Sequence, residues 1–431
     1  MSLFSLLNTA RTALFAHQRA IDVIGHNVAN ASAPGYSRQR LTLIAADPLH
    51  TSVGLIGRGV TDTGIFRVRD TLLDTAYRRS SGLLAQSSTT HDLLSQVESV
   101  LHEPSSTGLA STLDALFHSF ADLANTPASG TSRMLVRQAA MRVVQQLHDI
   151  DSQVAQVTRD AADRMSSQVD DVNQLTAGSA ALNAEIVAAG GPLHQAADLQ
   201  DRRDVMIDQL AGLMDVQTVE RPDGTIGVFS GSVMLVDVAS AQALSVTPSG
   251  GGLGVGLASG GGPITLTSGS LRALGDITAQ SVPALQASMN QFTQALVTEV
   301  NSVHGSGYTL NGATGVNFFD PAGLTMSTIA LSAAVTGSTD AIAAAAVNAS
   351  GDNAVALQLA ECGGAALVSL GGRSMRGFYI DVVGSVGVQV EGADRDSATR
   401  QAMTDQADVQ RQSVSGVSID DEMVSLIAQQ Q

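Results

Sequence analysis

The sequence is poor in the residues on which much protein chemistry depends. Its 431 residues include no Trp, no Lys and one Cys, and only 3% of them are aromatic. Without Lys there is no Walker A lysine and no Schiff-base or basic catalytic lysine. A single Cys362 allows neither an intrachain disulfide nor a multi-cysteine zinc site. We interpret Cys362 as a small residue of the core.

Long apolar runs and clustered ligands are missing too. No run of 18 apolar residues occurs, which argues against a membrane-spanning helix. The first residues have no basic start and include Arg11 and Arg19, unlike a cleaved secretory signal. The nine His are scattered, and there is no H-E-x-x-H or G-x-S-x-G motif. We therefore expect no catalytic, cofactor-binding or metal-binding residues and no enzyme activity.

The charge is negative overall and unevenly distributed. The formal net charge is −17, yet residues 1–79 hold nine Arg against five Asp, so the rest of the chain carries −21. An acidic bulk argues against nucleic-acid binding. A basic end on an acidic body predicts head-to-tail stacking of subunits, and two unrelated solvated surfaces are the alternative.

The first thirty residues carry a heptad pattern typical of a coiled coil. The positions are Leu3, Leu7, Ala10, Leu14, His17, Ile21, Ile24 and Val28. No second heptad segment follows directly to cover them. We predict that this seam is completed by the far end of the chain, where Met423, Leu426 and Ile427 start an amphipathic helix, or by another subunit.

The rest of the pattern predicts a mainly α chain with a smaller all-β part. A long helix is expected over 134–189, which at 1.5 Å per residue would be about 80 Å long and indicates a rod-shaped molecule. Period-two segments between 216 and 235 predict strands around a hairpin turn, and we expect the Gly-rich segment 249–263 to be a flexible connection. A polar helix is expected over 388–413.

Three domains follow from these patterns. We expect a terminal coiled-coil domain (1–33 with 414–431), a long helical rod domain (34–215 with 271–304 and 372–413) and a β-rich inserted domain (216–270 with 305–371).

Two acidic groups are interpreted as structural. Asp420, Asp421 and Glu422 fit capping and dipole partners in the first turn of the last helix, with a metal cluster as the alternative. Residues 198–204, Asp-Leu-Gln-Asp-Arg-Arg-Asp, predict ion pairs along one helix.

The end of the first helix carries a distinctive motif. Residues 24–31 are Ile-Gly-His-Asn-Val-Ala-Asn-Ala, and 34–39 are Pro-Gly-Tyr-Ser-Arg-Gln. The candidate motif residues are Asn27, Asn30, Pro34, Gly35, Tyr36 and Arg38. Residues 33–36 predict a type II turn, because Pro fixes φ at the second position and Gly takes a positive φ at the third. We expect the amides of Asn27 and Asn30 either to bond across helices or to be solvated at a frayed end.

This motif closely resembles the N-terminal signature of bacterial flagellar axial proteins, the rod, hook and hook-associated proteins. Its Tyr-Ser-Arg-Gln ending is similar to that of hook-associated members at the hook–filament junction. Segments 57–70, 198–204, 301–319 and 413–422 also agree, in the family's order. The family usually has Thr where this chain has Ala33. It also continues beyond Gln431, so we expect the last helix to be unfinished.

The resemblance implies an elongated multidomain axial protein, with a terminal coiled coil, a helical bundle and an inserted β-rich domain. It implies a structural subunit of the hook–filament junction that polymerises with copies of itself into a helical ring. The implied partners are the hook protein, a second junction protein and an export chaperone that binds the C-terminal segment, with no nucleic acid, no membrane insertion and no cofactor. It also implies export through the flagellar type III pathway, without a cleaved signal, to the outside of the cell. We further expect both terminal segments to be disordered in the monomer and to fold on stacking.

Three alternatives stay open at this point. The chain would be a rod or hook subunit, an exported hydrolase with axial-protein termini, or a soluble type III effector built from coiled coils. A hydrolase would need a pocket with paired carboxylates.

Overall fold

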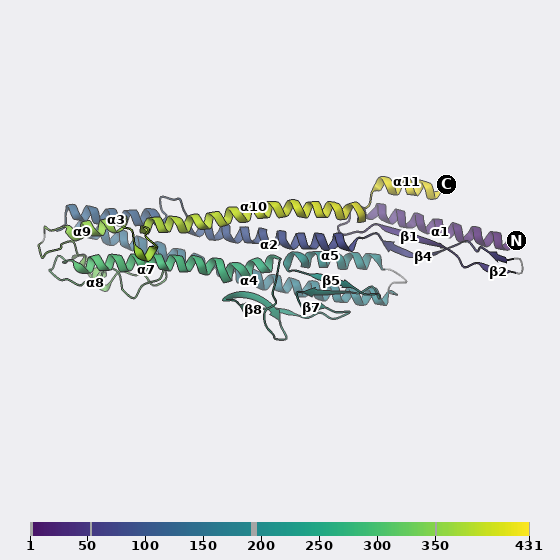
Figure 1. The fold of residues 1–431 in the computed structure, drawn as a ribbon, viewed down its shortest axis with the longest axis horizontal. Helices are drawn as coiled ribbons and strands as arrows, with labels where there is room; N and C mark the ends of the chain where they lie inside the picture. The colour runs from purple at the N-terminus through teal and green to yellow at the C-terminus, as the bar shows by residue number, and fades with distance from the viewer. Residues whose placement is uncertain (1–2, 52–53, 191–195, 350, 431) are drawn as a thin grey trace.

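A computed structural model describes residues 3–51, 54–190, 196–349 and 351–430. The molecule is elongated, with long helices side by side along its length and both termini at one end (Figure 1). None of the described helices is long and apolar enough to cross a membrane.

The rod is built on three long helices: α2 (Thr71–Leu101), α4 (Gly130–Ala188) and α10 (Met375–Ser415). The long helix expected over 134–189 is confirmed as α4, whose 59 residues correspond to about 89 Å. Its heptad positions point inward, and Val136, Val143 and Leu147 are fully buried. Ser129 begins this helix by accepting a hydrogen bond from the backbone N–H of Ser132.

Shorter helices complete the rod. They are α3 (Leu109–Asn125), α5 (Ala197–Leu213), α6 (Ser270–Asp276), the π-helical turn η2 (Ile277–Ser281) and α7 (Val282–Ser306). One continuous apolar core runs from Leu93 on α2 to Val386 on α10. Beyond Val386, Thr404 is the one buried residue that the structure describes on α10, consistent with the polar helix expected over 388–413. The rod therefore has a core of its own, independent of the terminal helices.

Two small antiparallel sheets pack on α4. Strands β5 (Gln217–Glu220), β6 (Ile226–Ser230) and β7 (Val233–Val236) form a meander, and β8 (Leu244–Ser249) pairs with β9 (Gly252–Leu257). The side-chain amide of Asn173 on α4 donates to the backbone carbonyl of Leu244 and accepts from its N–H. Strand β9 lies in the Gly-rich segment 249–263, which the sequence led us to expect as a connection.

The segment 305–371 differs from the β-rich expectation. Its described residues form isolated bridges and four short helices: α8 (Ala333–Gly337), η3 (Thr339–Ala341), α9 (Ala354–Cys362) and η4 (Val368–Leu370). Its apolar residues Phe318, Phe319 and Ile342 are buried in the rod core and do not line one face of a sheet. This segment completes the far end of the rod.

The buried imidazole of His304 fastens the segment to α7. Its Nδ1 lies 2.6 Å from the carbonyl of Val316, and its Nε2 accepts a hydrogen bond from the N–H of Ala343 at 2.8 Å. Burial lowers the pKa of His304 to about 4. Its imidazole is therefore a neutral link between α7 and this segment.

The terminal part consists of two helices and a long β-ribbon. Helix α1 (Leu3–Asn30) lies between α11 (Ile419–Gln430) and the ribbon, in which β1 (Gln39–Ala45) pairs with β4 (Val60–Arg67) and β2 (Leu49–Thr51) with β3 (Gly54–Ile56) (Figure 1). Strands β1 and β4 therefore pack with α1, and not in the rod as expected. Both terminal segments are helices in the single chain, where the sequence led us to expect disorder before assembly.

Candidate functional site

The site is the joint between the terminal helices and the rod, where α1, α5, α10, α11 and the ribbon meet. Asn27 is its centre. The residue is 1% exposed, and its side chain makes four hydrogen bonds. Its Oδ1 accepts from the Tyr36 hydroxyl at 2.8 Å and the Gln39 N–H at 2.9 Å. Its Nδ2 donates to the Gln39 carbonyl at 2.9 Å and to Glu422 at 3.1 Å. Every donor and acceptor of the amide is used.

Glu422 holds α11 in the joint. It is the one buried side chain described on α11, at 2% exposed. One carboxylate oxygen accepts from Arg38 Nε at 2.7 Å, and the other accepts from Asn27. The sequence interpretation of Glu422 as a capping residue missed this role. Ser418 does cap the helix, accepting from the N–H of Asp421 at 3.3 Å.

The Pro-Gly-Tyr motif seats the chain on α5. The N–H of Tyr36 bonds to the carbonyl of Ala33 at 3.2 Å, and Gly35 has φ 76°, as the predicted type II turn requires. A Cβ on Gly35 would lie 2.1 Å from a methyl group of Val205 on α5. Gly35 is thus required both by its backbone conformation and by its close approach to α5.

The two amides of the motif behave differently. Asn27 bonds across segments as expected, whereas the amide of Asn30 donates to the carbonyl of His26 on its own helix at 3.0 Å. Burial raises the pKa of the Tyr36 hydroxyl, and the carboxylates of Asp198, Asp201 and Glu422 raise it further. Tyr36 therefore stays a neutral donor to Asn27.

Carboxylates on α5 bind the two segments that connect the terminal part to the rod, one at Ser37 and the other at Arg67 and Arg69. Asp201 accepts from the backbone N–H of Ser37 at 3.1 Å and from its hydroxyl at 2.7 Å. Asp204 pairs with Arg67 at 2.7 Å and Arg69 at 2.6 Å. Burial would raise the pKa of Asp204, but the guanidinium groups of Arg67, Arg69 and Arg78 lower it to about 2.

The end of α10 is held by the same helix. Asp208 on α5 pairs with Arg78 of α2 and Arg411 of α10, each at 2.6 Å. The guanidinium of Arg411 also lies 3.7 Å from the ring centre of Tyr77. The prediction that residues 198–204 pair along one helix was therefore wrong: their partners lie on other segments. The spacing of Asp201, Asp204 and Asp208, about one helical turn from each to the next, was the feature of the sequence that could have indicated partners on other segments.

The basic end expected from the sequence is largely neutralised. Arg38, Arg67, Arg69 and Arg78 all pair with carboxylates at the joint. The exposed basic charge in this part of the chain is thus smaller than the sequence count suggests.

The predicted seam is covered only in part. Ile24 is buried, and Ile21 and Val28 are half-buried on the side of α1 near α11. His17 hydrogen-bonds to Gln429 near the end of α11, whereas Asn27 bonds to Glu422 near its start. Helix α11 therefore runs antiparallel to α1, and the described part of α11 covers the seam only as far as His17. The N-terminal half of the seam is open: Leu7 is 57% and Leu14 68% exposed.

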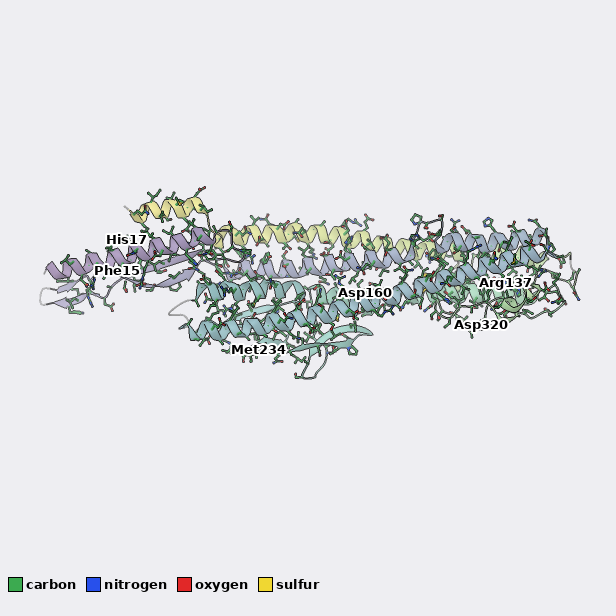
Figure 2. The ribbon with its side chains drawn as sticks, turned by 180° about the vertical axis from the view of Figure 1, so that it is seen from behind. Phe15, His17, Arg137, Asp160, Met234 and Asp320 are labelled. Carbon is green, nitrogen blue, oxygen red and sulfur yellow. The ribbon has the colours of Figure 1, made fainter. Side chains whose placement is uncertain are left out.

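Other predicted seam residues are also exposed. Ala10 and His17 are exposed on α1, and Met423 and Ile427 on α11, whereas Leu426 is half-buried. The side chain of Leu3 lies outside those that the structure describes. Phe15, beside the seam, is 58% exposed. Phe15 and His17 lie at the end of the molecule opposite to Arg137 and Asp320 (Figure 2).

The side chains of the joint are engaged with one another through hydrogen bonds and ion pairs. Within the described ranges, no group of three or more His, Cys, Asp or Glu is placed to hold a metal ion. Cys362 is buried, and burial raises the pKa of its thiol to about 11, which suits a core residue.

Comparison with known proteins gives the family. A model described as the flagellar hook-associated protein FlgK helical domain matches residues 94–319, more than half of the chain. The chain belongs to the flagellar hook-associated protein FlgK family. A second model, for flagella basal body rod protein, matches residues 7–36, which contain most of α1 and the Pro-Gly-Tyr turn. The resemblance drawn from the sequence is confirmed, and a FlgK-family chain is a structural component of the flagellum.

Comparison with individual relatives gives the same family. Flagellar hook-associated protein 1 of Bacillus subtilis (strain 168) is 28% identical over 475 residues, covering 99% of this chain and 93% of that protein. The protein of the same name from Salmonella typhimurium is 26% identical, and the match covers 73% of this chain and 59% of that protein. The solved hook junction protein FlgK from Burkholderia pseudomallei shares the fold, with a TM-score of 0.70 and 16% identity over 80% of this chain and all of that one.

Proposed function

We propose that this chain is a structural subunit of the junction between the flagellar hook and filament, and that it polymerises through its terminal helices. The observation that carries the proposal is the open half of the α1 seam. Leu7, Leu14 and Phe15 are all more than half exposed on the part of α1 that α11 does not reach. Full burial of such a side chain is worth roughly 1.5–3 kcal/mol, so covering the exposed part of each would contribute roughly 1–2 kcal/mol, which favours association with other subunits.

The joint has a role in this assembly. A seam shared by many copies requires every copy to hold its terminal helices at the same angle to the rod. Asn27, Glu422 and the carboxylates of α5 fix that angle through buried bonds. Buried polar groups of this kind favour one arrangement because each alternative leaves a partner unsatisfied.

The proposed partners are copies of this chain, the hook protein and a second junction protein. An export chaperone would bind the C-terminal segment, where Val424 and Ile427 of α11 are exposed. The subunit would be exported without a cleaved signal, act outside the cell and have no enzyme activity. We retain three domains, with residues 34–67 assigned to the terminal domain and 305–371 to the rod.

A deletion strain tests the function. Removing the gene from its own bacterium should leave hooks that carry no filaments in electron micrographs, and resupplying the chain should restore the filaments. Normal filaments on the deletion strain would contradict the proposal. Loss of the hooks as well as the filaments would instead indicate a rod or hook subunit.

The open seam is tested by two substitutions. Leu7→Ser with Leu14→Ser should leave the rod folded and the chain exported, but no filaments should form. Leu72→Ser is the matched control, because Leu72 is 78% exposed at the start of α2, outside the terminal part. Filaments in the double variant at the control's level would refute the role of the seam.

A further inference from the structure

Four asparagine side chains in the described part of the chain make the same pair of hydrogen bonds. Each lies on a helix, donates through Nδ2 to the backbone carbonyl of one residue, and accepts through Oδ1 from the N–H of that same residue. We call this arrangement an amide clasp. The clasps join Asn27 of α1 to Gln39, Asn173 and Asn183 of α4 to Leu244 and Ile226, and Asn301 of α7 to Phe319, at distances of 2.7–3.1 Å.

Every clasped residue has the same place in a β element. Gln39, Ile226 and Leu244 are the first residues of β1, β6 and β8, and Phe319 forms an isolated bridge with Leu331. The carbonyl of the residue just before each of them accepts a hydrogen bond from the partner strand; these four bonds run from Val68 to Arg38, Arg221 to Thr225, Ala258 to Ala243 and Ser332 to Phe318.

This placement explains what the asparagines bind. In an antiparallel ladder, the N–H and C=O of one residue point to one edge of the strand, and those of the next residue point to the other edge. Since the residue before each clasped residue bonds to the partner strand, the clasped residue turns its own N–H and C=O toward the opposite edge. The asparagine amide occupies that edge with one donor and one acceptor, as a neighbouring strand would.

The β8–β9 hairpin shows why such a contact is needed. It is a two-stranded sheet, and three of the six residues of β9 are glycines. Few side chains are therefore available to determine where the hairpin packs on α4, and the register of a Gly-rich strand is weakly specified by packing alone. The two hydrogen bonds of Asn173 select one residue of the hairpin.

We propose that Asn173, Asn183 and Asn301 are positioning residues which, like Asn27 at the joint, determine where each β element docks on its helix. A shift of the strand by one residue would bring groups that point to the other edge, and both bonds of the clasp would be lost together. Every copy of the chain then carries its β elements in the same place. This inference goes beyond the proposed function, because it concerns the single chain before it meets a partner.

Asn173 is the clearest residue on which to test the clasp. It is half-buried, and its amide bonds to the backbone of Leu244. Asn183 is less suitable, because its Oδ1 also accepts from Arg203 at 2.9 Å, and an Asp at that position would gain an ion pair.

The test is hydrogen–deuterium exchange of the full chain carrying Asn173→Asp, measured relative to the native chain. At pH 7.5 the carboxylate has no donor for the carbonyl of Leu244, so residues 244–257 should exchange about thirtyfold faster, from the loss of two hydrogen bonds. A protonated carboxyl has one donor and one acceptor, as the amide does, and closes the clasp again. The excess should therefore fall to about threefold at pH 4.

Two further variants serve as controls. Asn173→Ala has neither donor nor acceptor, so its excess should remain about thirtyfold at both pH values, which separates the clasp from the titration of the nearby Asp170 and Asp171. Gln145→Ala, whose amide bonds to Asp149 of the same helix, should leave residues 244–257 unchanged. Recovery in the Asp variant alone supports the proposal. Equal excess in the Asp and Ala variants at pH 4 would overturn it.

Asn301→Ala provides a second measurement at another clasp. It should speed exchange in residues 316–332 and leave 244–257 unchanged, because each clasp holds its own β element. A similar rise in both segments, or a rise throughout α4 in the Asn173 variants, would show general destabilisation and overturn the proposal.

Discussion

Replacing Asn27 by Ala should release the terminal helices from the rod while leaving the rod folded. The substitution removes four hydrogen bonds that join α1, the start of β1, Tyr36 and Glu422. It leaves the Gln39 N–H and a carboxylate oxygen of Glu422 buried without that partner. The rod should be unaffected, because its core begins at Leu93 and includes no residue of the terminal part.

The size of the effect follows from the bonds lost. Each contributes a net of about 1 kcal/mol, and an unsatisfied buried group costs more, so a total of about 3–5 kcal/mol is expected. Since about 1.4 kcal/mol is a factor of ten, the opening equilibrium of the terminal part should rise at least about a hundredfold.

Hydrogen–deuterium exchange read by mass spectrometry measures this opening by segment. In the Asn27→Ala chain, peptides from residues 16–45 and 419–430 should exchange faster, and peptides from 136–172 should not change. Asn30→Ala is the control, because its amide bonds only within α1. Equal exchange in the Asn27 and Asn30 variants, or faster exchange throughout the rod, would refute the reasoning.

Three further predictions concern single side chains. Gly35→Ala, strained at φ 76° and in collision with Val205, should expose the turn to limited proteolysis, whereas Gly25→Ala, with open space around it, should not. Asp204→Asn should lower the stability of the joint by about 3–5 kcal/mol, seen as faster exchange of residues 60–70, and Asp163→Asn on the exposed side of α4 should have no effect. The folded-state pKa of His304, about 4, lies below its unfolded value, so its stabilisation is complete above about pH 6.5 and is lost as the pH falls toward 4, by up to about 3 kcal/mol. Urea unfolding at pH 7 and pH 5 should show this loss in the native chain and not in His304→Asn.

Elements set by local periodicity could be predicted from the sequence. The heptad spacing of α4 gave its length within a few residues, because a helix buries one face along its whole length. The type II turn was also accessible, since Pro34 and Gly35 determine it locally. The strands between residues 217 and 236 followed from alternation and turn residues, whereas β8 was not predicted and β9 lies in the Gly-rich segment expected to be a connection.

The joint could not be predicted in the same way. Asn27 and Glu422 are 395 residues apart, and no local pattern shows that a carboxylate at the start of α11 would be buried against an amide of α1. The heptad pattern likewise identified α1 as a helix with an apolar stripe but not how much of that stripe its own chain would cover. Segment 305–371 was misjudged because small residues such as Ala and Ser suit irregular structure as well as strands.

Side-chain footprinting of Leu7, Leu14 and Phe15 tests the central claim most directly, namely that neighbouring copies cover these exposed side chains of α1. Hydroxyl-radical labelling should modify these three side chains readily in the isolated chain and weakly in purified hook–filament junctions, while exposed Leu72 is labelled equally in both. Equal labelling of Leu7, Leu14 and Phe15 in the two states would contradict the account.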